Sequence, residues 1–514
     1  MIRIRRYCSE DGPQLAQLFY DTVHSVNARD YAPEQLDAWA TGEVDLDAWD
    51  ARYQKSLTLI AEENDEIAGF ANMESGGILD MLYVHRDSQG RGVATLLCDA
   101  LENATPVETY STYASITAKP FFEKRGYHVV KEQQVPLRGQ VLTNYRMEKN
   151  VQRPAMLYIH IPFCAKKCAY CDFVSYAGRE GRFSAYIDAL IAEMDKRPSR
   201  QRITSVFLGG GTPSILPAGE LSRLLQAVGQ RYDLAPRCEI TSEANPGTVT
   251  REWLEAAVRG GVNRLSVGVQ TVQPELLRAI GRIHDFAQVE ETFRLARQAG
   301  IGNLSADLMY ALPGQTLDMW RQSLEEVMQL SPWHLSCYAL TVAEGTPFGE
   351  LDARGELPRP DEDEEMAMQD STAEVLGKHG LFQYEVSNYA KPGCACRHNV
   401  GYWTRRDYIG LGCAAHSLER KLRRSNVCDL ETYISGAAFD AQEELSIQDA
   451  AFEELMLGLR MVEGVELTPY TAALFEKKLL RQQGRGLLTL RDRRVKLTQR
   501  GFDVMNTVLA ELMP

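Results

Sequence analysis

Between residues 156 and 341, short apolar runs alternate with longer amphipathic stretches, and this alternation constrains the fold more than any other feature of the chain. The apolar runs have the length and the β-branched content of strands; they span 156–163, 205–211, 238–245, 264–270, 303–312 and 334–341. Helical periodicity falls between them, near 183–195, 220–231, 251–260, 286–299 and 316–330. Strands that alternate with crossover helices form a parallel sheet. Six such units are too few for a closed eight-stranded barrel, so we predict a partial (β/α)6 barrel with its chemistry at the carboxyl ends of the strands.

Three cysteines follow the first predicted strand, in the spacing C-x3-C-x2-C: Cys164, Cys168 and Cys171. The irons of an iron–sulfur cluster are held by thiolates and normally require four. Three thiolates would leave one iron open to a ligand from outside the protein. Taken alone, the run also allows a structural zinc knuckle or ordinary loop cysteines.

Glycines and polar residues stand at the ends of the later predicted strands. They are Gly209-Gly-Gly-Thr-Pro213, Glu243-Ala-Asn245, Gly268-Val-Gln270 and Asp307. The three glycines are expected to leave room for a ligand against the backbone. Each feature by itself has a plain structural explanation, such as a turn, a capping asparagine or a salt bridge. Their recurrence at successive strand ends favours a ligand site.

The cysteine run, with Tyr170 before its last cysteine, resembles the signature of the radical S-adenosylmethionine (SAM) family. In that family the open iron binds the amino and carboxylate groups of SAM, which is then cleaved reductively. The resemblance implies that the three cysteines ligate a [4Fe–4S] cluster, supplied with electrons by a reductant such as flavodoxin or ferredoxin. It also implies a set of SAM contacts: Tyr158, Tyr170, Gly209, Gly210, Gly211, Thr212, Glu243, Gln270, Arg282 and Asp307.

From about Pro154 onward the chain resembles the oxygen-independent coproporphyrinogen III oxidase group, and most closely its heme chaperone branch. The oxidases of the group carry a fourth cysteine that falls at position 173, where this chain has Phe173. Phenylalanine cannot replace a thiol, so oxidative decarboxylation of coproporphyrinogen III is kept as the alternative function. A second alternative is a carrier whose cluster supports heme transfer without radical turnover.

The segment His398-Asn399-Val-Gly-Tyr402-Trp403 matches the H-N-x-x-Y-W motif of the heme chaperone branch. The resemblance implies that His398 binds heme, since imidazole is a common axial ligand of heme iron. A hydrogen-bonded structural histidine is the alternative. The glycine-rich segment that carries Cys413 is expected to line the same cavity. A heme-recipient protein is the implied partner.

Residues 1 to about 148 resemble the GCN5-related N-acetyltransferases (GNAT). The resemblance rests on a strand at 78–84, a glycine turn before a helix that begins at Ala94, and the later Gly126-Tyr127 pair. Such a turn offers backbone N–H groups to a phosphate. It implies a mixed α/β fold that binds acetyl-CoA through a set of contacts: Val84, Gln89, Gly90, Gly92 and Ala94.

Phe122 stands where many of these enzymes have a tyrosine that protonates the departing thiolate. A hydrocarbon ring donates no proton. Tyr113 and Tyr127 are the candidates for the missing acid. A degenerate domain that only binds acyl-CoA is the alternative to an active transferase.

At 514 residues the chain is expected to hold several domains, with boundaries at 1–150, 151–345, 346–445 and 446–514. The last is expected to be a small winged-helix-like bundle around a hairpin at 486–496. A net charge of −14 argues against unselective nucleic-acid binding, and no apolar run is long enough to span a membrane. Eleven cysteines, partly clustered, favour a reducing compartment, so a cytoplasmic protein is expected.

Overall fold

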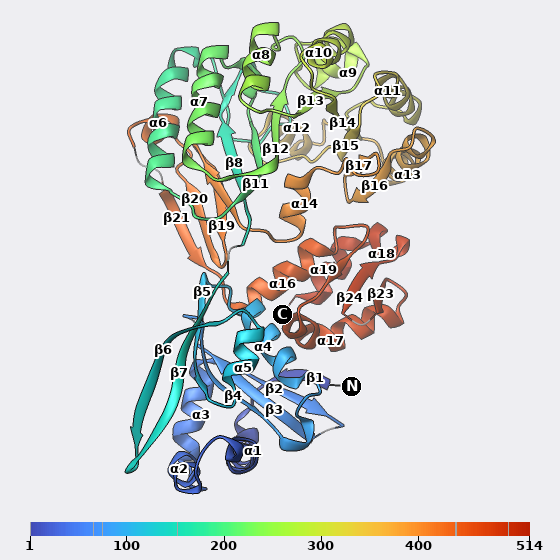
Figure 1. Cartoon of the computed structure of the whole chain (residues 1–514). Coiled ribbons are helices and arrows are strands. Elements are labelled where there is room, and N and C mark those ends of the chain that lie inside the picture. Colours follow the sequence, from blue (N-terminus) through green and yellow to red (C-terminus); the bar gives the residue numbers. More distant parts are fainter. Residues whose placement is uncertain are drawn as a thin grey trace. The chain divides into compact units, whose positions relative to one another are not determined.

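The computed structural model describes residues 2–64, 66–74, 76–151, 153–436, 439–491 and 493–513 (Figure 1). Its chain forms two compact units. The first comprises Met1–Arg153, Leu445–Leu459 and Gly464–Pro514, and the second comprises Pro154–Glu444 and Arg460–Glu463. The two units are described separately below.

Six parallel strands form the centre of the second unit, and they lie side by side in chain order. They are β8 (Ala155–Ile161), β11 (Ile203–Gly210), β12 (Leu234–Ala244), β13 (Arg264–Gln270), β14 (Asn303–Tyr310) and β15 (His334–Ala339). Every residue of β13 is buried. Strands covered on both faces read as nearly continuous apolar runs, which is why the sequence revealed them.

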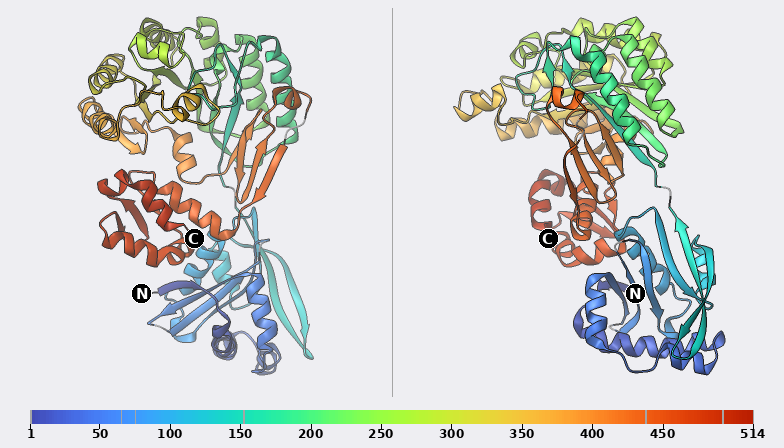
Figure 2. Two further views of the ribbon diagram at one scale, coloured as in Figure 1. Left: turned by 180° about the vertical axis from the view of Figure 1, so that it is seen from behind. Right: turned by 90° about the vertical axis from the view of Figure 1, so that its left-hand side faces the viewer.

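Helices connect these strands and cover the outer side of the sheet, as Figures 1 and 2 show for α6, α7 and α8. The crossover helices are α6 (Phe183–Lys196), α7 (Ala218–Arg231), α8 (Arg251–Arg259), α10 (Phe286–Gln298) and α11 (Leu317–Gln329). Three of these helices, α8, α10 and α11, begin with an N-cap residue whose side chain accepts a backbone N–H of the first turn. These N-cap residues are Thr250, Asp285 and Thr316. The predicted alternation and the partial (β/α)6 barrel are therefore confirmed.

The sheet extends beyond the six predicted strands at both edges. β18 (Tyr408–Leu411) pairs parallel to β8, and antiparallel strands follow it: β19 (His416–Glu419), β20 (Leu422–Asn426) and β21 (Phe439–Glu444). At the other edge β15 pairs antiparallel with β17 (Asn388–Ala390), and β17 pairs with β16 (Phe382–Glu385). Sequence reasoning missed β18, because a strand of four residues is too short to show a period.

The cysteine run lies on the loop after β8. Within it β9 (Phe163–Cys164) pairs parallel with β10 (Tyr176–Ala177). The remaining helices of this unit are α9 (Pro274–Ala279), α12 (Pro347–Ala353), α13 (Glu362–Lys378), α14 (Arg397–Trp403) and α15 (Leu430–Ile434). Cys413 does not line the cavity described below, contrary to expectation: it is fully buried, and its thiol donates to the Cys428 carbonyl oxygen at 2.9 Å.

The N-terminal part of the first unit is a mixed α/β domain around one sheet, with the strand order β1-β2-β3-β4-β5-β7-β6. Its strands are β1 (Ile2–Arg6), β2 (Leu57–Glu63), β3 (Glu66–Met73), β4 (Ile78–Val84), β5 (Thr109–Ser115), β6 (His128–Leu137) and β7 (Gln140–Asn150). Its helices are α1 (Gly12–Ser25), α2 (Pro33–Trp39), α3 (Leu46–Lys55), α4 (Val93–Ala104) and α5 (Lys119–Lys124). β4 and β5 pair in parallel through only two positions each and then diverge.

The C-terminal segment belongs by its contacts to the same unit as this sheet. It holds α16 (Ile447–Gly458), α17 (Pro469–Gly484), α18 (Gln499–Asp503) and α19 (Met505–Leu512) around a small sheet of β22 (Val465–Glu466), β24 (Arg494–Leu497) and β23 (Leu488–Arg491). The predicted hairpin is thus present. α17 lies against β1 and α4, and Arg3 forms an ion pair with Glu476 at 2.9 Å. No helix among the described residues is both long enough and apolar enough to cross a membrane.

Candidate functional site

A cavity of about 520 Å³ occupies the interior of the barrel where the predicted site residues converge. All three cysteines of the run line it. Among the residues expected to bind SAM, those that line it are Tyr170, Gly210, Gly211, Thr212, Glu243, Gln270, Arg282 and Asp307. Tyr158 and Gly209 do not line it. The strand ends therefore do gather chemistry at one place, as a partial barrel requires.

A chain of hydrogen bonds ties the cysteine loop to the strand ends. Arg282 donates to Asn245 Oδ1 at 2.7 Å and to the Tyr170 hydroxyl at 3.4 Å. Asn245 Nδ2 donates to Thr212 Oγ1 at 2.8 Å, and Thr212 Oγ1 donates to Cys164 Sγ at 3.5 Å. Asn245 thus holds Arg282 and Thr212 in place. Its position after β12 indicated that it matters, but it was not among the residues expected to contact SAM.

Tyr158 acts behind the cavity wall. Its hydroxyl donates to His160 Nδ1 at 2.9 Å, because His160 Nε2 donates to the Val174 carbonyl oxygen at 2.9 Å and so carries the proton. Burial lowers the pKa of His160, which keeps the ring neutral. Through Val174, this pair fixes the chain that follows the last cysteine. In this conformation Tyr158 positions the cysteine loop.

The glycine run makes room for protein rather than only for a ligand. A Cβ on Gly211 would lie 2.6 Å from the Phe163 carbonyl oxygen, and one on Gly210 would lie 2.3 Å from the His160 ring. Gly210 also has a φ of +108°, which side chains rarely adopt. A Cβ on Gly209 would meet Phe207 at 2.8 Å. Gly210 and Gly211 still line the cavity, so the expectation that the glycine run leaves room for a ligand stays a prediction, and the run also makes room for Phe207, His160 and Phe163.

Two carboxyl groups, Glu243 and Asp307, face the interior of the barrel. Glu243 Oε2 accepts the Gly210 N–H at 3.2 Å, and both Asp307 oxygens accept from Ser266 Oγ at 3.0 Å. Burial, and then the nearby Asp307, raise the pKa of Glu243 from 4.5 to about 8. Burial also raises the pKa of Asp307. Two acids enclosed together resist double ionisation.

Alternate residues of β13 line the cavity along the whole strand: Arg264, Ser266, Gly268 and Gln270. This period of two is what a strand imposes. Of these four residues, only Gln270 was predicted to contact a ligand. The alternation of side chains along the predicted strand would have indicated the other three. Gln270 ends the strand with a φ of +67°, uncommon for a residue other than glycine and typical of functional sites. Further lining residues that were missed are Phe207, Met309, Ser336, Tyr338 and Asn399.

His398 lies outside the lining of this cavity, next to it. It is 1% exposed, with Nδ1 hydrogen-bonded to Ser205 Oγ at 3.0 Å and Nε2 to the Tyr402 hydroxyl at 3.1 Å. Its ring packs on Phe207 with centroids 5.2 Å apart. Burial and the nearby Arg264 lower its pKa to about 3, so the imidazole is neutral. Both ring nitrogens thus have side-chain partners in this conformation.

The first unit has its own cavity, of about 380 Å³, where β4 and β5 diverge. Val84, Gln89 and Ala94 line it, whereas Gly90 and Gly92 do not. Gln89 Nε2 donates to the Val84 carbonyl oxygen at 2.7 Å, which closes the turn. Gly92 precedes α4 with a φ of +87°, and no side chain caps this helix. The N–H groups of its first turn therefore remain for an anion.

Phe122 lies at this cavity and is 2% exposed. Tyr127 does not lie there, because its hydroxyl donates to Glu102 Oε1 at 3.1 Å. Tyr113 lines the cavity but is 53% exposed. Tyr127 is thus not placed to be the missing acid, and Tyr113 is the one of the two candidates that reaches the cleft.

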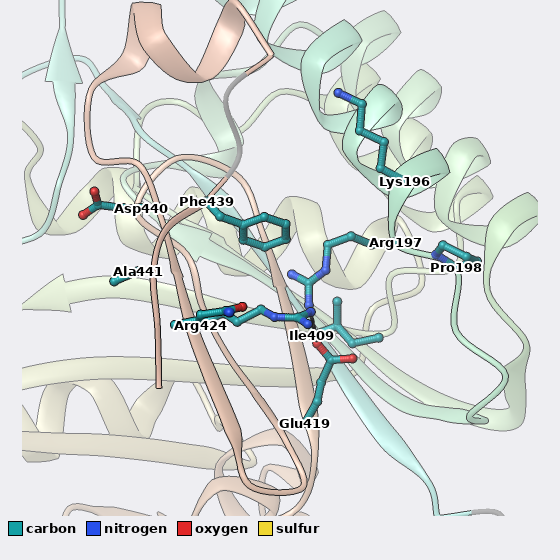
Figure 3. Close-up of a pocket in the computed structure, with 10 residues that line it drawn as sticks. Lys196, Arg197, Pro198, Ile409, Glu419, Arg424, Phe439, Asp440 and Ala441 are labelled. Carbon is teal, nitrogen blue, oxygen red and sulfur yellow. Dashed lines mark hydrogen bonds and ion pairs between the residues drawn. The ribbon is translucent and has the colours of Figure 1, made fainter. Parts of the chain in front are cut away.

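A further cavity of about 450 Å³ in the second unit lies beside Phe439 (Figure 3). Arg197 and Arg424 each place their guanidinium 5.4 Å from the centroid of the Phe439 ring. Both also form ion pairs with Glu419, Arg424 at 3.3 Å. The cations here are satisfied within the protein, and this cavity recruits none of the predicted site residues.

Three family models match separate segments of the chain. The radical SAM superfamily model matches residues 158–327, the HemN C-terminal domain model matches 445–504, and the acetyltransferase (GNAT) domain model matches 27–149. The solved coproporphyrinogen III oxidase (HemN) of Escherichia coli has a TM-score of 0.63 at 23% identity, covering 70% of this chain and 90% of that one. That likeness shows a shared fold.

Curated relatives are more similar in sequence. The chain is 34% identical over 373 residues to the heme chaperone HemW of Lactococcus lactis, covering 71% of this chain and 98% of the relative. It is 37% identical over 330 residues to the heme chaperone HemW of Escherichia coli, covering 62% of this chain and 86% of the relative. It is 33% identical to a mitochondrial radical S-adenosyl methionine domain-containing protein 1 of Danio rerio, covering 70% and 87%.

The elevated pKa of Glu243 predicts a dependence of stability on pH. The folded protein holds a proton, up to about pH 8, that the unfolded chain releases near 4.5. The ligand-free protein should therefore lose stability as the pH rises between these values. Glu243→Gln should remove much of this loss. The thermal midpoint of unfolding from pH 6 to pH 9 measures it, with the exposed Glu290→Gln as control. Parallel profiles for the wild type and Glu243→Gln would show that Glu243 ionises normally.

Proposed function

We propose that this chain, which belongs to the heme chaperone HemW family of radical SAM proteins, binds heme as cargo and passes it to a recipient protein. The observation that carries the proposal is this family relationship, in which the similarity extends over almost the whole of a heme chaperone. The N-terminal GNAT domain adds a second ligand, acetyl-CoA, to the same chain.

The residues at the barrel cavity suit a [4Fe–4S] cluster and SAM. The thiols of Cys164, Cys168 and Cys171 are free and come from one loop that borders the cavity. No three His, Cys, Asp or Glu side chains in the described part of the chain are placed to hold a single metal ion. Each cysteine thiolate of a [4Fe–4S] cluster binds a different iron atom, so three separated thiols suit a cluster better than a zinc knuckle, in which the ligands converge on one ion.

When bound, the cluster and SAM supply one-electron reductive chemistry. The residues proposed to hold SAM are those at the strand ends, with Tyr170 against the adenine and Glu243, Gln270, Arg282 and Asp307 on its polar groups. Arg282 and Asn245 connect the cysteine loop to the end of β11 by hydrogen bonds, so the site is organised before its ligand binds. A protein reductant such as flavodoxin or ferredoxin is proposed as the electron donor.

Phe173 argues for carriage over decarboxylation. It lies at the cavity with 63% of its surface exposed, and it offers no thiol at the position where the oxidases of the group have one. Oxidation of coproporphyrinogen III is the second candidate function, favoured by the fold that the chain shares with that enzyme. An exposed aromatic ring at the rim suits contact with the flat face of a porphyrin.

We assign His398 as the iron ligand, with iron replacing the Tyr402 hydroxyl as the partner of Nε2. Its neutral imidazole has one nitrogen with a lone pair, the form that binds metals. If Nδ1 donates to Ser205, Nε2 accepts from the Tyr402 hydroxyl, and iron would take the place of that hydroxyl. Metal-bound histidines commonly donate their other N–H in this way. Tyr402 is half-buried and is the side chain that must move.

The GNAT domain is proposed to bind acetyl-CoA at the cleft between β4 and β5, with the pyrophosphate at the first turn of α4. Transfer to an amine requires an acid that Phe122 cannot supply. Tyr113, exposed at the cleft, is the proposed substitute. All eleven cysteines of the chain are free thiols, which supports a reducing compartment and the cytoplasm as the proposed location.

Substitutions at His398 and Tyr402 test the heme ligand. His398→Ala should weaken heme binding and shift the Soret band, whereas Tyr402→Phe should keep the band and tighten binding by about fivefold, because a hydrogen bond of about 1 kcal/mol no longer competes. Absorption titration of anaerobically reconstituted protein measures both. The exposed His416→Ala is the matched control. A Soret band indifferent to loss of His398 would make this ligand assignment wrong.

Substitution of Gly92 tests the acetyl-CoA site. Gly92→Ala should weaken binding by about tenfold, because a side chain strains a φ of +87° and crowds the turn that faces the pyrophosphate. Gly139→Ala carries a similar strain, at a φ of +81°, in the hairpin between β6 and β7. Calorimetry on the full chain measures both affinities. Equal affinities for the two variants would place acetyl-CoA elsewhere.

A further inference from the structure

Arg264 is a buried cation that has anions nearby but no direct partner for its guanidinium. It begins β13 and is 1% exposed, yet it borders the barrel cavity. Its guanidinium makes no hydrogen bond or ion pair with any residue in the described ranges, and its Nε is buried without a partner. A guanidinium has five donors and stays charged at any pH a protein survives.

Two carboxylates, Asp307 and Glu239, act electrostatically on Arg264, but the hydrogen bonds described for them come from other groups. Asp307 accepts hydrogen bonds from the hydroxyl groups of Ser266 and Ser336. Glu239 accepts the backbone N–H groups of Arg397 and His398, each at 3.2 Å, and so caps α14. A buried guanidinium without a direct hydrogen bond destabilises the folded protein, because it has left water and gained no partner in return. A protein can tolerate this destabilisation at a site where a bound ligand provides the partner.

A second polar group faces the same part of the cavity. Asn399 borders the cavity, and its side-chain amide has no hydrogen-bond partner within the described chain. Asn399 follows His398, and the cation of Arg264 is close enough to lower the pKa of His398. Arg264, Asn399 and the proposed iron ligand thus lie in one region of the barrel.

We propose that Arg264, with Asn399, binds a carboxylate of the cargo, namely a propionate of the heme; this inference rests on the proposed function. A guanidinium offers two parallel N–H groups to a carboxylate, and the Asn399 amide offers a further donor. The propionate would supply a directly hydrogen-bonded anion, which the nearby Asp307 and Glu239 do not.

The methionine carboxylate of SAM is the other source of the same chemistry, and the position of Arg264 disfavours it. Gln270, expected at the SAM end of the site, ends β13. Arg264 begins the same strand, which places the two Cα atoms about 20 Å apart at about 3.3 Å per residue. The cysteines stand on the loop after β8, at the carboxyl ends of the strands. The backbone of Arg264 therefore lies deeper in the barrel than the cysteine loop, while its charge still acts on Glu243 and Asp307.

The test compares heme with its dimethyl ester, in which both propionates are capped, in Soret titrations of the full reconstituted chain. The wild type should bind heme about 10- to 100-fold more tightly than the ester, as expected for a charged hydrogen-bonded pair. Arg264→Met should bind the two ligands nearly equally, and Arg264→Lys should fall between. The exposed Arg259→Met should behave as the wild type. Ligand-free Arg264→Met should have a thermal midpoint equal to or above that of the wild type, which a structural arginine would not allow.

Each contrary result has a distinct meaning. If Arg264→Met still discriminates against the ester as the wild type does, the assignment of the propionate to Arg264 is overturned. If equilibrium dialysis shows that Arg264→Met loses affinity for SAM and keeps its discrimination against the ester, the carboxylate is that of SAM and the proposal fails. If the wild type shows no Soret band with either ligand, heme binding itself fails, and this inference fails with it.

Discussion

The close packing of the cysteine loop on the glycine run is the constraint on which the site depends. The Gly211 N–H donates to the Ile161 carbonyl oxygen at 2.9 Å, and the Thr212 N–H donates to that of Phe163 at 2.7 Å. Only glycine fits at 211, because a Cβ would lie 2.6 Å from Phe163. This contact sets Cys164 beside Thr212, and from Thr212 the hydrogen bonds pass through Asn245 to Arg282. The loop and three strand ends are thereby fixed as one body.

Much of this architecture was predictable, and the parts that were not share a physical reason. Buried parallel strands are continuous apolar runs, so their order followed from the sequence. β18 was missed because it is short and pairs with β8, some 250 positions earlier in the chain. Arg264 and Ser266 were missed because the run that contains them was used only as a strand, and its interior face was not followed residue by residue.

The side-chain partners of the site lay beyond sequence reasoning. His398 could be recognised by its motif, but its bond to Ser205 joins positions 193 residues apart. The glycines at 209–211 were recognised, but what fills the space beside them depends on Phe207, His160 and Phe163. A position can indicate that a residue matters at a strand end. Its neighbours across the fold decide whether it touches a ligand or holds the loop that does.

The central claim is that the second unit carries heme and does not oxidise porphyrinogen. Phe173 leaves no thiol at the rim, and the buried, neutral imidazole of His398 is the proposed iron ligand. The most direct measurement is one anaerobic experiment on the reconstituted full chain with SAM and a reductant, in which heme and coproporphyrinogen III are offered in parallel. The account predicts a stoichiometric Soret band with heme and no protoporphyrinogen IX from coproporphyrinogen III. Conversion of coproporphyrinogen III to protoporphyrinogen IX with proportional consumption of SAM would contradict it.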